Sequence, residues 1–262
     1  MRTERIQLGE VPGPLVDLDV GRGGRWVGVC GELRRPTHLV FDGASLPLSV
    51  SCLYPIVRLV DDGRAVLVGT RSRRSEQNAW IVGRDGSIER SFRAGDAIED
   101  LVVCGDRLVV TYFDEALGSP DGFYGVAAFD FDGNLVWSYR DGFGGDVIDC
   151  YCACPVGRAS VFFLGYPGFD AVLLDVSGGK RTTWPAPPLV HGAHAVTVAG
   201  DTAFFFGSYG DHEMLARWRF GDDRADRIGT RKGRLRGLRG GRMLALEESS
   251  CVILSFDDEL GG

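Results

Sequence analysis

Short apolar runs that end in an Asp-Gly pair recur along this chain of 262 residues. The clear copies are Phe41-Asp42-Gly43, Arg84-Asp85-Gly86 and Phe131-Asp132-Gly133, and weaker copies lie at 175–178, 220–222 and 256–258. Successive copies are about 36 to 47 residues apart. Self-similarity at a period of 20 to 50 residues is typical of repeat architectures, in which each repeat is one small structural unit. The repeat therefore predicts about six copies of one unit that stack against each other.

The segments between these turns are typical of β-strands rather than helices. They are short and rich in Val, Phe, Tyr, Trp and Leu, as at 65–70, 108–113, 160–164 and 203–206, and turn residues bound them. No window of 12 residues keeps a helical apolar stripe without a Gly or Pro in it. A period of about 40 residues built from such strands is the length of one four-stranded blade of a β-propeller.

The pattern predicts an all-β, six-bladed β-propeller as a single domain over 1–262. We expect the blades to lie roughly at 16–50, 56–94, 98–140, 148–185, 193–231 and 235–257. The last blade lacks its outer strand, and the run at 4–8 has no partner of its own. Placing 4–8 in the last blade closes the ring and satisfies an otherwise unpaired edge. Five blades, or a pair of β-sandwiches, are the alternatives.

Two stretches resemble known propeller groups. The run Ala128-Phe-Asp130-Phe-Asp-Gly133-Asn-Leu-Val-Trp137 is similar to the repeat of quinoprotein-type propellers, one residue shorter. In that family the tryptophan docks one blade on the next, so the resemblance implies a packing role for Trp137. The stretch 107–154 resembles a group of bacterial propeller proteins without an assigned activity, which share Tyr-Phe-Asp-Glu (112–115) and Asp-Cys-Tyr (149–151). That resemblance implies a fold and no function.

Composition narrows the classes of function. The net charge is −7, which disfavours a nucleic-acid binder. No apolar run approaches the 18–20 residues of a membrane span, and the start has no signal-like stretch. We therefore expect a soluble, cytoplasmic protein, a monomer or part of a complex, that does not bind membranes. Its seven cysteines are expected to be reduced and mostly buried. The three at Cys150, Cys152 and Cys154 are expected on one side of an inner strand, as packing residues.

Charge is unevenly distributed. Residues 217–242 hold ten basic and three acidic residues, a local net charge of +7, so the rest of the chain carries −14. Such a segment is either a solvated strand face with its loops or a basic surface that binds an anionic partner.

In a propeller, the loops between strands two and three share one face with the loops between blades, and ligands bind there. Several of these loops carry aromatic side chains, among which we expect Tyr54, Tyr112 and Tyr166. They also carry arginine and acidic side chains, and this combination is typical of protein interfaces. The longest such loop, 114–124, starts with two acids and ends with two aromatics. The predicted binding residues on this face are Arg71, Arg73, Arg74, Asp114, Glu115, Phe123, Tyr124, Asp149, Tyr166, His191, His194, Tyr209 and His212.

We also expect a ring of charged residues along the channel, at the inner strands: Asp17, Arg58, Asp100, Asp149, His194 and Arg236. Asp100, Asp149 and His194 are weak candidates for metal ligands. The two arginines favour structural ion pairs instead, so we expect neither a metal nor another cofactor.

The sequence thus favours a non-catalytic scaffold that binds another protein through this loop face, for example an immunity protein that inhibits a bacterial toxin. A metal-dependent hydrolase or lyase of the lactonase-like propeller type is the first alternative, with Asp114 or His212 as the base. A sugar or small-molecule binding protein is the second. Signatures of sialidases, serine hydrolases, phosphate loops and zinc proteases are absent from the sequence, and the fold does not choose among these functions.

Overall fold

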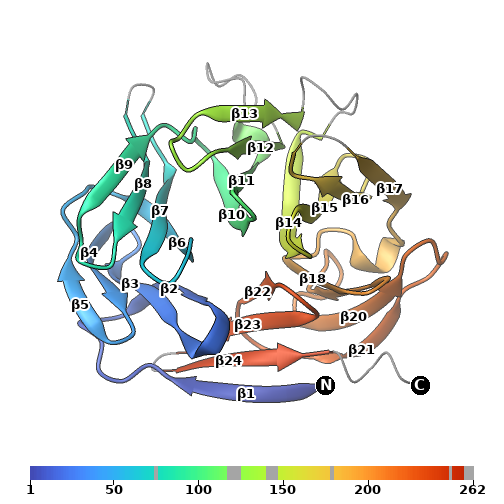
Figure 1. Cartoon of the computed structure of the whole chain (residues 1–262). Coiled ribbons are helices and arrows are strands. Elements are labelled where there is room, and N and C mark those ends of the chain that lie inside the picture. The colour runs from blue at the N-terminus through green and yellow to red at the C-terminus, as the bar shows by residue number, and fades with distance from the viewer. Residues whose placement is uncertain (74–75, 117–124, 140–146, 178–179, 248–249, 257–262) are drawn as a thin grey trace.

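The structure is a computed structural model of the chain, and it describes residues 1–73, 76–116, 125–139, 147–177, 180–247 and 250–256. Within these ranges, 24 strands form six four-stranded antiparallel sheets, and the helical segments are three single-turn 3-10 helices. The sheets stand as blades around a central channel (Figure 1). The all-β, six-bladed propeller predicted from the sequence is therefore confirmed. No helix in the described ranges is long and apolar enough to span a membrane.

Each blade is one sheet, and its strands follow one another from the channel outward. The strands of the first three blades are β2 (Leu15–Val20), β3 (Trp26–Glu32), β4 (Arg35–Phe41), β5 (Ala44–Pro47); β6 (Leu53–Leu59), β7 (Arg64–Arg71), β8 (Ala79–Gly83), β9 (Ile88–Phe92); and β10 (Ile98–Cys104), β11 (Arg107–Tyr112), β12 (Val126–Phe129), β13 (Leu135–Ser138).

The next two blades have the same order, and the sixth takes its outermost strand from the N-terminus. Their strands are β14 (Asp149–Val156), β15 (Ser160–Tyr166), β16 (Asp170–Asp175), β17 (Arg181–Pro185); β18 (Ala195–Ala199), β19 (Thr202–Phe206), β20 (Met214–Arg219), β21 (Asp226–Thr230); and β22 (Leu235–Leu238), β23 (Arg242–Leu246), β24 (Ser250–Ser255), β1 (Arg2–Gln7).

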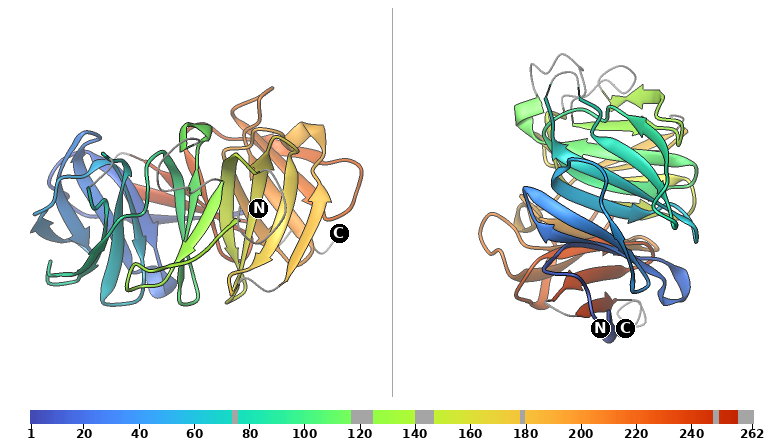
Figure 2. Two further views of the ribbon diagram at one scale, coloured as in Figure 1. Left: turned by 90° about the horizontal axis from the view of Figure 1, so that it is seen from above. Right: turned by 90° about the vertical axis from the view of Figure 1, so that its left-hand side faces the viewer.

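The pairing of β1 with β24 closes the ring. The two strands are antiparallel in a register that runs from Arg2 opposite Ser255 to Gln7 opposite Ser250, and the first and last strands of the chain lie side by side in two views (Figures 1 and 2). The sequence places this strand at 4–8, and the structure places it two residues earlier at its start. The closure itself is as predicted.

The repeated Asp-Gly pairs connect the third and fourth strands of the first three blades. Gly43, Gly86 and Gly133 have φ values of 87°, 85° and 86°, a region that glycine enters without steric cost. The aspartate of the first turn also ties the blade together, because Asp42 Oδ1 accepts a hydrogen bond of 2.7 Å from the Trp26 amide. The repeat is thus a hairpin signal, and its period is the spacing of the blades.

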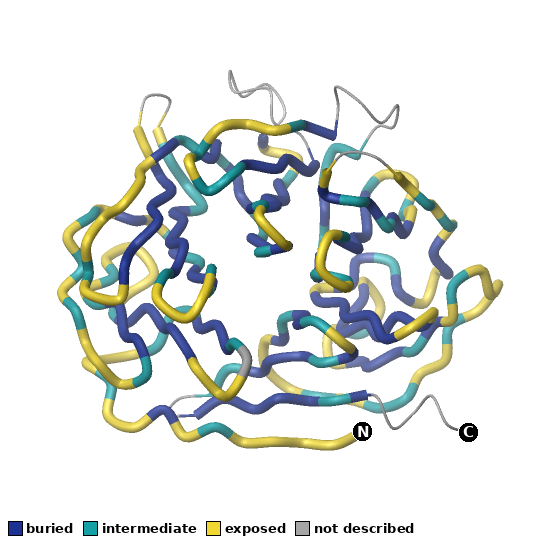
Figure 3. The backbone as a smooth tube through the Cα atoms, viewed as in Figure 1, coloured by how far each residue is buried: buried dark blue, intermediate teal, exposed yellow. Residues whose placement is uncertain are grey.

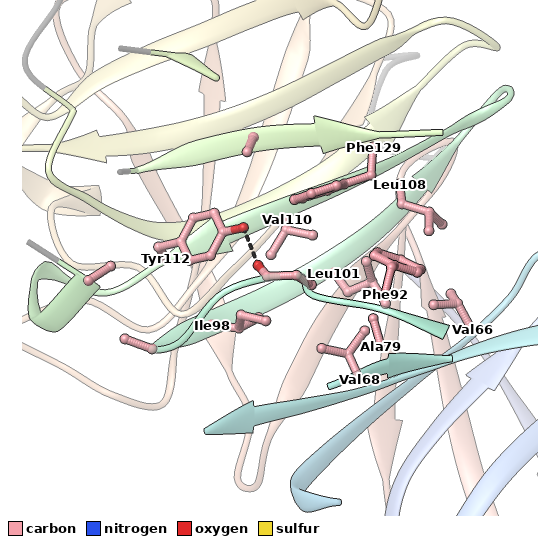
Figure 4. Packing of buried hydrophobic residues seen from close by; sticks show 14 of the residues in the cluster. Val66, Val68, Ala79, Phe92, Ile98, Leu101, Leu108, Val110, Tyr112 and Phe129 are labelled. Carbon is pink, nitrogen blue, oxygen red and sulfur yellow. Dashed lines mark hydrogen bonds between the residues drawn. The ribbon is translucent and has the colours of Figure 1, made fainter. Parts of the chain in front are cut away.

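Most of the core lies between neighbouring blades. Strand interiors are buried, while exposure concentrates in hairpins and outer strands (Figure 3). Between the second and third blades, Val66, Val68 and Phe92 pack with Leu101 and Phe129 in one cluster (Figure 4).

One tryptophan and one tyrosine show how polar side-chain groups find hydrogen-bond partners in this packing. Trp137 Nε1 donates a hydrogen bond of 2.7 Å to the Val176 carbonyl of the next blade, as the quinoprotein resemblance implies. Tyr112, expected among the loop aromatics, is instead fully buried, and its hydroxyl donates to the Ala94 carbonyl at 2.5 Å. That expectation was wrong because Tyr112 ends a central strand and its ring points into the core between blades.

Three inner strands carry a β-bulge near their start. The pairing register shifts between Leu15 and Asp17 in β2, between Ile98 and Asp100 in β10, and between Cys150 and Cys152 in β14. A bulge inserts one unpaired residue and redirects its side chain. Here the extra residues are Val16, Glu99 and Tyr151, and all three line the channel.

The bulge in β14 corrects the prediction for the cysteine run. Cys152 and Cys154 belong to the cluster shared with the fifth blade, whereas Cys150 packs in the cluster shared with the third. The three thiols therefore lie on two sides of the strand, because the extra residue interrupts the alternation. All seven cysteines are buried free thiols, as expected.

Candidate functional site

A cavity of about 620 Å³ opens at the end of the channel where the inner strands begin. We call this end the loop mouth, because the loops between blades surround it. All six blades contribute to its lining, for example through Val16, Tyr54, Ile98, Tyr151, His194 and Arg234. The volume lies in the range of small-ligand sites, and it would also admit one side chain of a bound peptide.

Ion pairs close the channel below this cavity. Arg58 of β6 is 3% exposed, and its Nη1 and Nη2 lie 2.6 Å from Asp17 and 2.5 Å from Asp100. Its Nε donates to the Leu101 carbonyl at 2.8 Å. Burial alone would lower the pKa of Arg58, but the neighbouring carboxylates outweigh burial and raise it. Arg58 is therefore a fixed cation that joins three blades.

A second ion pair completes this closure of the channel. We call the five ion-paired residues, Asp17, Asp19, Arg58, Asp100 and Arg236, the waist. Arg236 of β22 binds Asp19 of β2 at 2.6 Å. Burial would raise the pKa of Asp19, but Arg236 and Arg58 outweigh burial and lower it. Four of the charged residues predicted along the channel are thus in two structural ion-pair groups, with Asp19 in addition.

Two carboxyl groups at the loop mouth, those of Glu99 and Asp149, form no ion pair within the described part of the chain. Oε2 of Glu99 is buried and has no hydrogen-bond partner, and burial together with Asp100 and Asp149 raises the pKa of Glu99 to about 8. Burial and the nearby Asp114 raise the pKa of Asp149 to about 6. Glu99 is therefore mostly protonated at pH 7, and it can either donate a hydrogen bond or ionise next to a bound cation.

Five rings form one wall of the loop mouth on the fourth and fifth blades. They are Tyr151, Tyr166, Phe169, His191 and Tyr209. The Tyr151 and Tyr209 hydroxyls are hydrogen-bonded to each other. Tyr151 stacks on Phe169 with ring centroids 6.0 Å apart, and Phe169 stacks on His191 at 4.0 Å. We call these five residues the aromatic wall.

The wall joins the cavity to the outer surface. Tyr151 lines the cavity, while Tyr209 is 58% exposed on the rim. A rigid group of aromatic rings with one exposed face is a typical anchor of a protein interface.

The local backbone places these rings. Gly192 has a φ of 73°, and a Cβ there would lie 2.5 Å from the Tyr209 ring, so only glycine lets that ring lie over the 188–194 loop. Phe169 has a φ of 53°, which is rare for a bulky residue and costs backbone energy. Strain of this kind gathers at binding sites, although it does not by itself identify one.

The opposite side of the loop mouth is built from arginines and a second strained aromatic. Tyr54, with a φ of 52°, lines the cavity, and its hydroxyl accepts a hydrogen bond of 2.6 Å from Arg34 Nε. Arg71 of β7 forms a 2.8 Å ion pair with Glu115 and lies over the Phe113 ring. The mouth thus has an aromatic wall facing a rim of paired arginines.

Two histidines lie between these groups. His194 Nε2 and His212 Nδ1 are 3.0 Å apart. Partial burial and the neighbouring His212 lower the pKa of His194 and favour its neutral form. One of the two rings donates this hydrogen bond and the other accepts it. Asp100 is bound to Arg58 rather than facing these rings. In the described part of the chain, no group of three or more His, Cys, Asp or Glu is arranged to hold a metal ion.

The remaining predicted residues are spread around the rim. Asp114 is exposed in the 3-10 helix Asp114–Ala116, and Arg73 is exposed beside the β7–β8 hairpin. Arg74, Phe123 and Tyr124 lie outside the described residues.

The sequence did not predict several residues that line the cavity, among them Glu99, Tyr151 and Arg234. Strict alternation assigns Glu99 and Tyr151 to ordinary positions of a strand, and only the bulges turn their side chains toward the channel. For Tyr151, the Asp-Cys-Tyr stretch carries part of the signal.

Sequence comparisons found no matching family model and no matching curated protein. The structure, in contrast, is similar to many solved propellers. Virginiamycin B lyase from Staphylococcus aureus aligns at 12% identity and a TM-score of 0.54, over 97% of this chain and 99% of that one. The WD40 propeller of Doa1 aligns at 11% identity and 0.55, over 98% and 99%. YCF48 bound to a D1 peptide aligns at 10% and 0.50, over 97% of both chains.

These identities carry the fold and not the function, since a lyase and a WD40 domain match about equally well. They agree with the six closed sheets seen here. The chain has the six-bladed β-propeller fold, with an aromatic wall and a cavity of mixed polar and apolar lining at one end of its channel.

Proposed function

We propose that this protein is a non-catalytic scaffold whose loop mouth binds a peptide segment of a partner protein. The observation that carries the proposal is the aromatic wall, which runs from the cavity to the exposed ring of Tyr209. Aromatic rings held rigidly lose little entropy when a partner covers them. An immunity protein that inhibits a bacterial toxin is one form of such a scaffold.

The charges support a basic anchor in that peptide. Arg71 and Arg58 already have acidic partners, whereas Glu99 and Asp149 form no ion pair among the residues that the structure describes. A lysine or arginine side chain inserted beside Tyr151 would place a cation next to them and stack on an aromatic ring. Arg234 also lines the cavity, and its charge partly offsets the rise in the pKa of Glu99. Arg234 favours an extended peptide with an acidic or carbonyl group nearby.

Selection from a random peptide library on the immobilised protein tests the proposal. We expect enriched peptides to contain a basic residue beside a hydrophobic one. Tyr209→Ser should weaken their binding about tenfold or more, as for a central aromatic anchor. Ile88→Ser is the matched control, because Ile88 is an exposed apolar residue (43%) on the outer strand β9, and it should leave binding unchanged. Equal binding by both variants would reject the aromatic wall as the site.

A lyase or hydrolase is the second candidate, and the His194–His212 pair is the observation that favours it. A neutral histidine with a lowered pKa can take a proton from a substrate. His194→Gln and His212→Gln should then abolish turnover of the substrate, whereas the control Ile88→Ser should leave it unchanged. Binding of glycans instead of peptides at the loop mouth would favour the sugar-binding alternative.

A further inference from the structure

The channel has a second opening, at the ends of the inner strands, which we call the far mouth. A cavity of about 380 Å³ lies there. It shares Arg58, Asp100, Arg236 and Gly237 with the lining of the loop-mouth cavity, so the ion-paired waist separates the two. The far mouth plays no part in the proposed peptide binding.

Three arginines line the far mouth without a carboxylate partner in the described part of the chain. Arg239 and Arg242 flank the turn between β22 and β23, and Arg158 lies in the turn between β14 and β15. Arg239 Nη2 reaches only the Val103 carbonyl across the channel, at 3.4 Å, and Arg242 Nε reaches only the Arg239 carbonyl, at 3.1 Å. Both side chains come from half-buried residues.

The acids near these arginines are already engaged. Asp19 is bound by Arg236, and Asp100 by Arg58. Asp106 lies 2.6 Å from Arg107, and Asp175 accepts hydrogen bonds from the amide and hydroxyl of Ser177 at 2.8 and 2.5 Å. The far mouth therefore has three uncompensated positive charges around one concavity.

The basic segment identified in the sequence accounts for this excess. Of its arginines, five take carboxylates: Arg217, Arg219, Arg227, Arg231 and Arg236. Arg239 and Arg242 line the far mouth, whereas Arg234 lines the loop-mouth cavity. The local charge of +7 is thus partly neutralised by ion pairs, and Arg239 and Arg242 leave positive charge at the far mouth.

We propose that the far mouth binds a small, multiply charged anion that carries phosphate or carboxylate groups. Guanidinium groups that converge on one cavity repel each other, and an anion relieves this repulsion while it accepts charge-assisted, bidentate hydrogen bonds. A volume of 380 Å³ suits a small metabolite rather than a polymer.

Calorimetric titration at constant ionic strength tests this proposal, with inorganic pyrophosphate as the phosphate probe and citrate as the carboxylate probe. We expect saturable binding of at least one probe at one site per chain. The probe that binds shows whether the site prefers phosphate or carboxylate groups. The double variant Arg239→Gln/Arg242→Gln should weaken binding by at least tenfold. Arg217→Gln/Arg219→Gln is the control with the same loss of charge in the same segment, but on β20 outside the channel, and it should bind as the wild type does.

A second measurement does not depend on a folded variant. Phenylglyoxal modifies accessible arginines, and mass spectrometry reports which ones. The bound probe should protect Arg158, Arg239 and Arg242, but not Arg219. Absence of saturable binding by both probes, or equal binding by the two double variants, would overturn the proposal.

Discussion

Two ionisable residues of the channel, Arg58 and Glu99, have very different surroundings in the same cavity. Arg58 has two carboxylates and two carbonyls within hydrogen-bond distance. Arg58 therefore helps to hold the blades together. Glu99 has a buried oxygen atom without a hydrogen-bond partner, and such atoms are frequent at binding sites.

The raised pKa of Glu99 makes stability depend on pH. Its pKa is about 8 in the folded protein against 4.5 as the ordinary value, so the folded state holds a proton that the unfolded chain releases between these pH values. Stability is therefore lost as pH rises through this window, and the full cost is present above about pH 8.

Glu99→Gln should remove this cost. Because the site is partly solvated, we expect a stabilisation of about 1–2 kcal/mol at pH 9 and little change at pH 5. Urea unfolding at both pH values measures the difference, and Glu32→Gln is the control at an exposed carboxylate. A stabilisation that is the same at both pH values would contradict the assignment of a protonated Glu99.

Replacement of Arg58 tests the waist. Arg58→Met leaves Asp17 and Asp100 without their cation, so we expect a loss of about 3–5 kcal/mol, as for other broken buried pairs. Adding Asp17→Asn and Asp100→Asn should recover part of that loss, because it removes the stranded charges. Denaturant unfolding of the three proteins decides the matter, and a triple variant less stable than Arg58→Met would show that the charges themselves are not the cause.

For single residues, the sequence predicted well which residue types line the channel, but it predicted poorly which way their side chains point. The waist could be predicted, since charged residues at the starts of neighbouring inner strands must face one channel. Tyr151 and Glu99 could not, because a bulge depends on the pairing register with the neighbouring strand, and a single strand does not carry that information. Tyr112 was misplaced for the related reason that a strand end can still be core.

Among the elements, β1 has the largest effect on the whole ring, because it alone joins the N-terminus to the last blade. It covers the edge of β24, and Leu8 just beyond it is 3% exposed. Without β1, the edge of β24 would present unpaired backbone groups.

Deletion of residues 1–8 should therefore lower the melting temperature and promote self-association, because the open edge can pair with another copy. A synthetic peptide with the sequence of residues 1–8 should restore the oligomeric state of the full chain, and a scrambled peptide should not. Light scattering after size-exclusion chromatography measures both effects. A deleted protein that is monomeric and as stable as the full chain would show that β1 does not hold the ring closed.

The number and order of the blades could be predicted because turns and periodicity are local signals. An Asp-Gly turn needs only its own glycine with positive φ, and six periods fit in the chain only if the two ends share a blade. The composition of the loop mouth was harder, since it joins residues from six blades. The aromatic side was foreseen in part through Tyr166, His191 and Tyr209.

For the whole molecule, the two ends of the channel differ in chemistry. Among the described residues, the loop mouth has an aromatic wall and carboxyl groups without an ion pair, whereas the far mouth has arginines without a carboxylate partner. The ion pairs of the waist lie between the two cavities, and Arg58 at their centre is buried. The two proposals therefore concern opposite ends of one channel, a peptide at the loop mouth and an anion at the far mouth.

Hydrogen exchange of the protein with and without a selected peptide tests the central claim most directly. We predict that the peptide slows exchange in 149–153, 166–169, 188–194 and 207–213, which form the aromatic wall and its loops, and leaves the outer strand β9 unchanged. Protection confined to outer strands or to the far mouth, with the aromatic wall unaffected, would contradict the account.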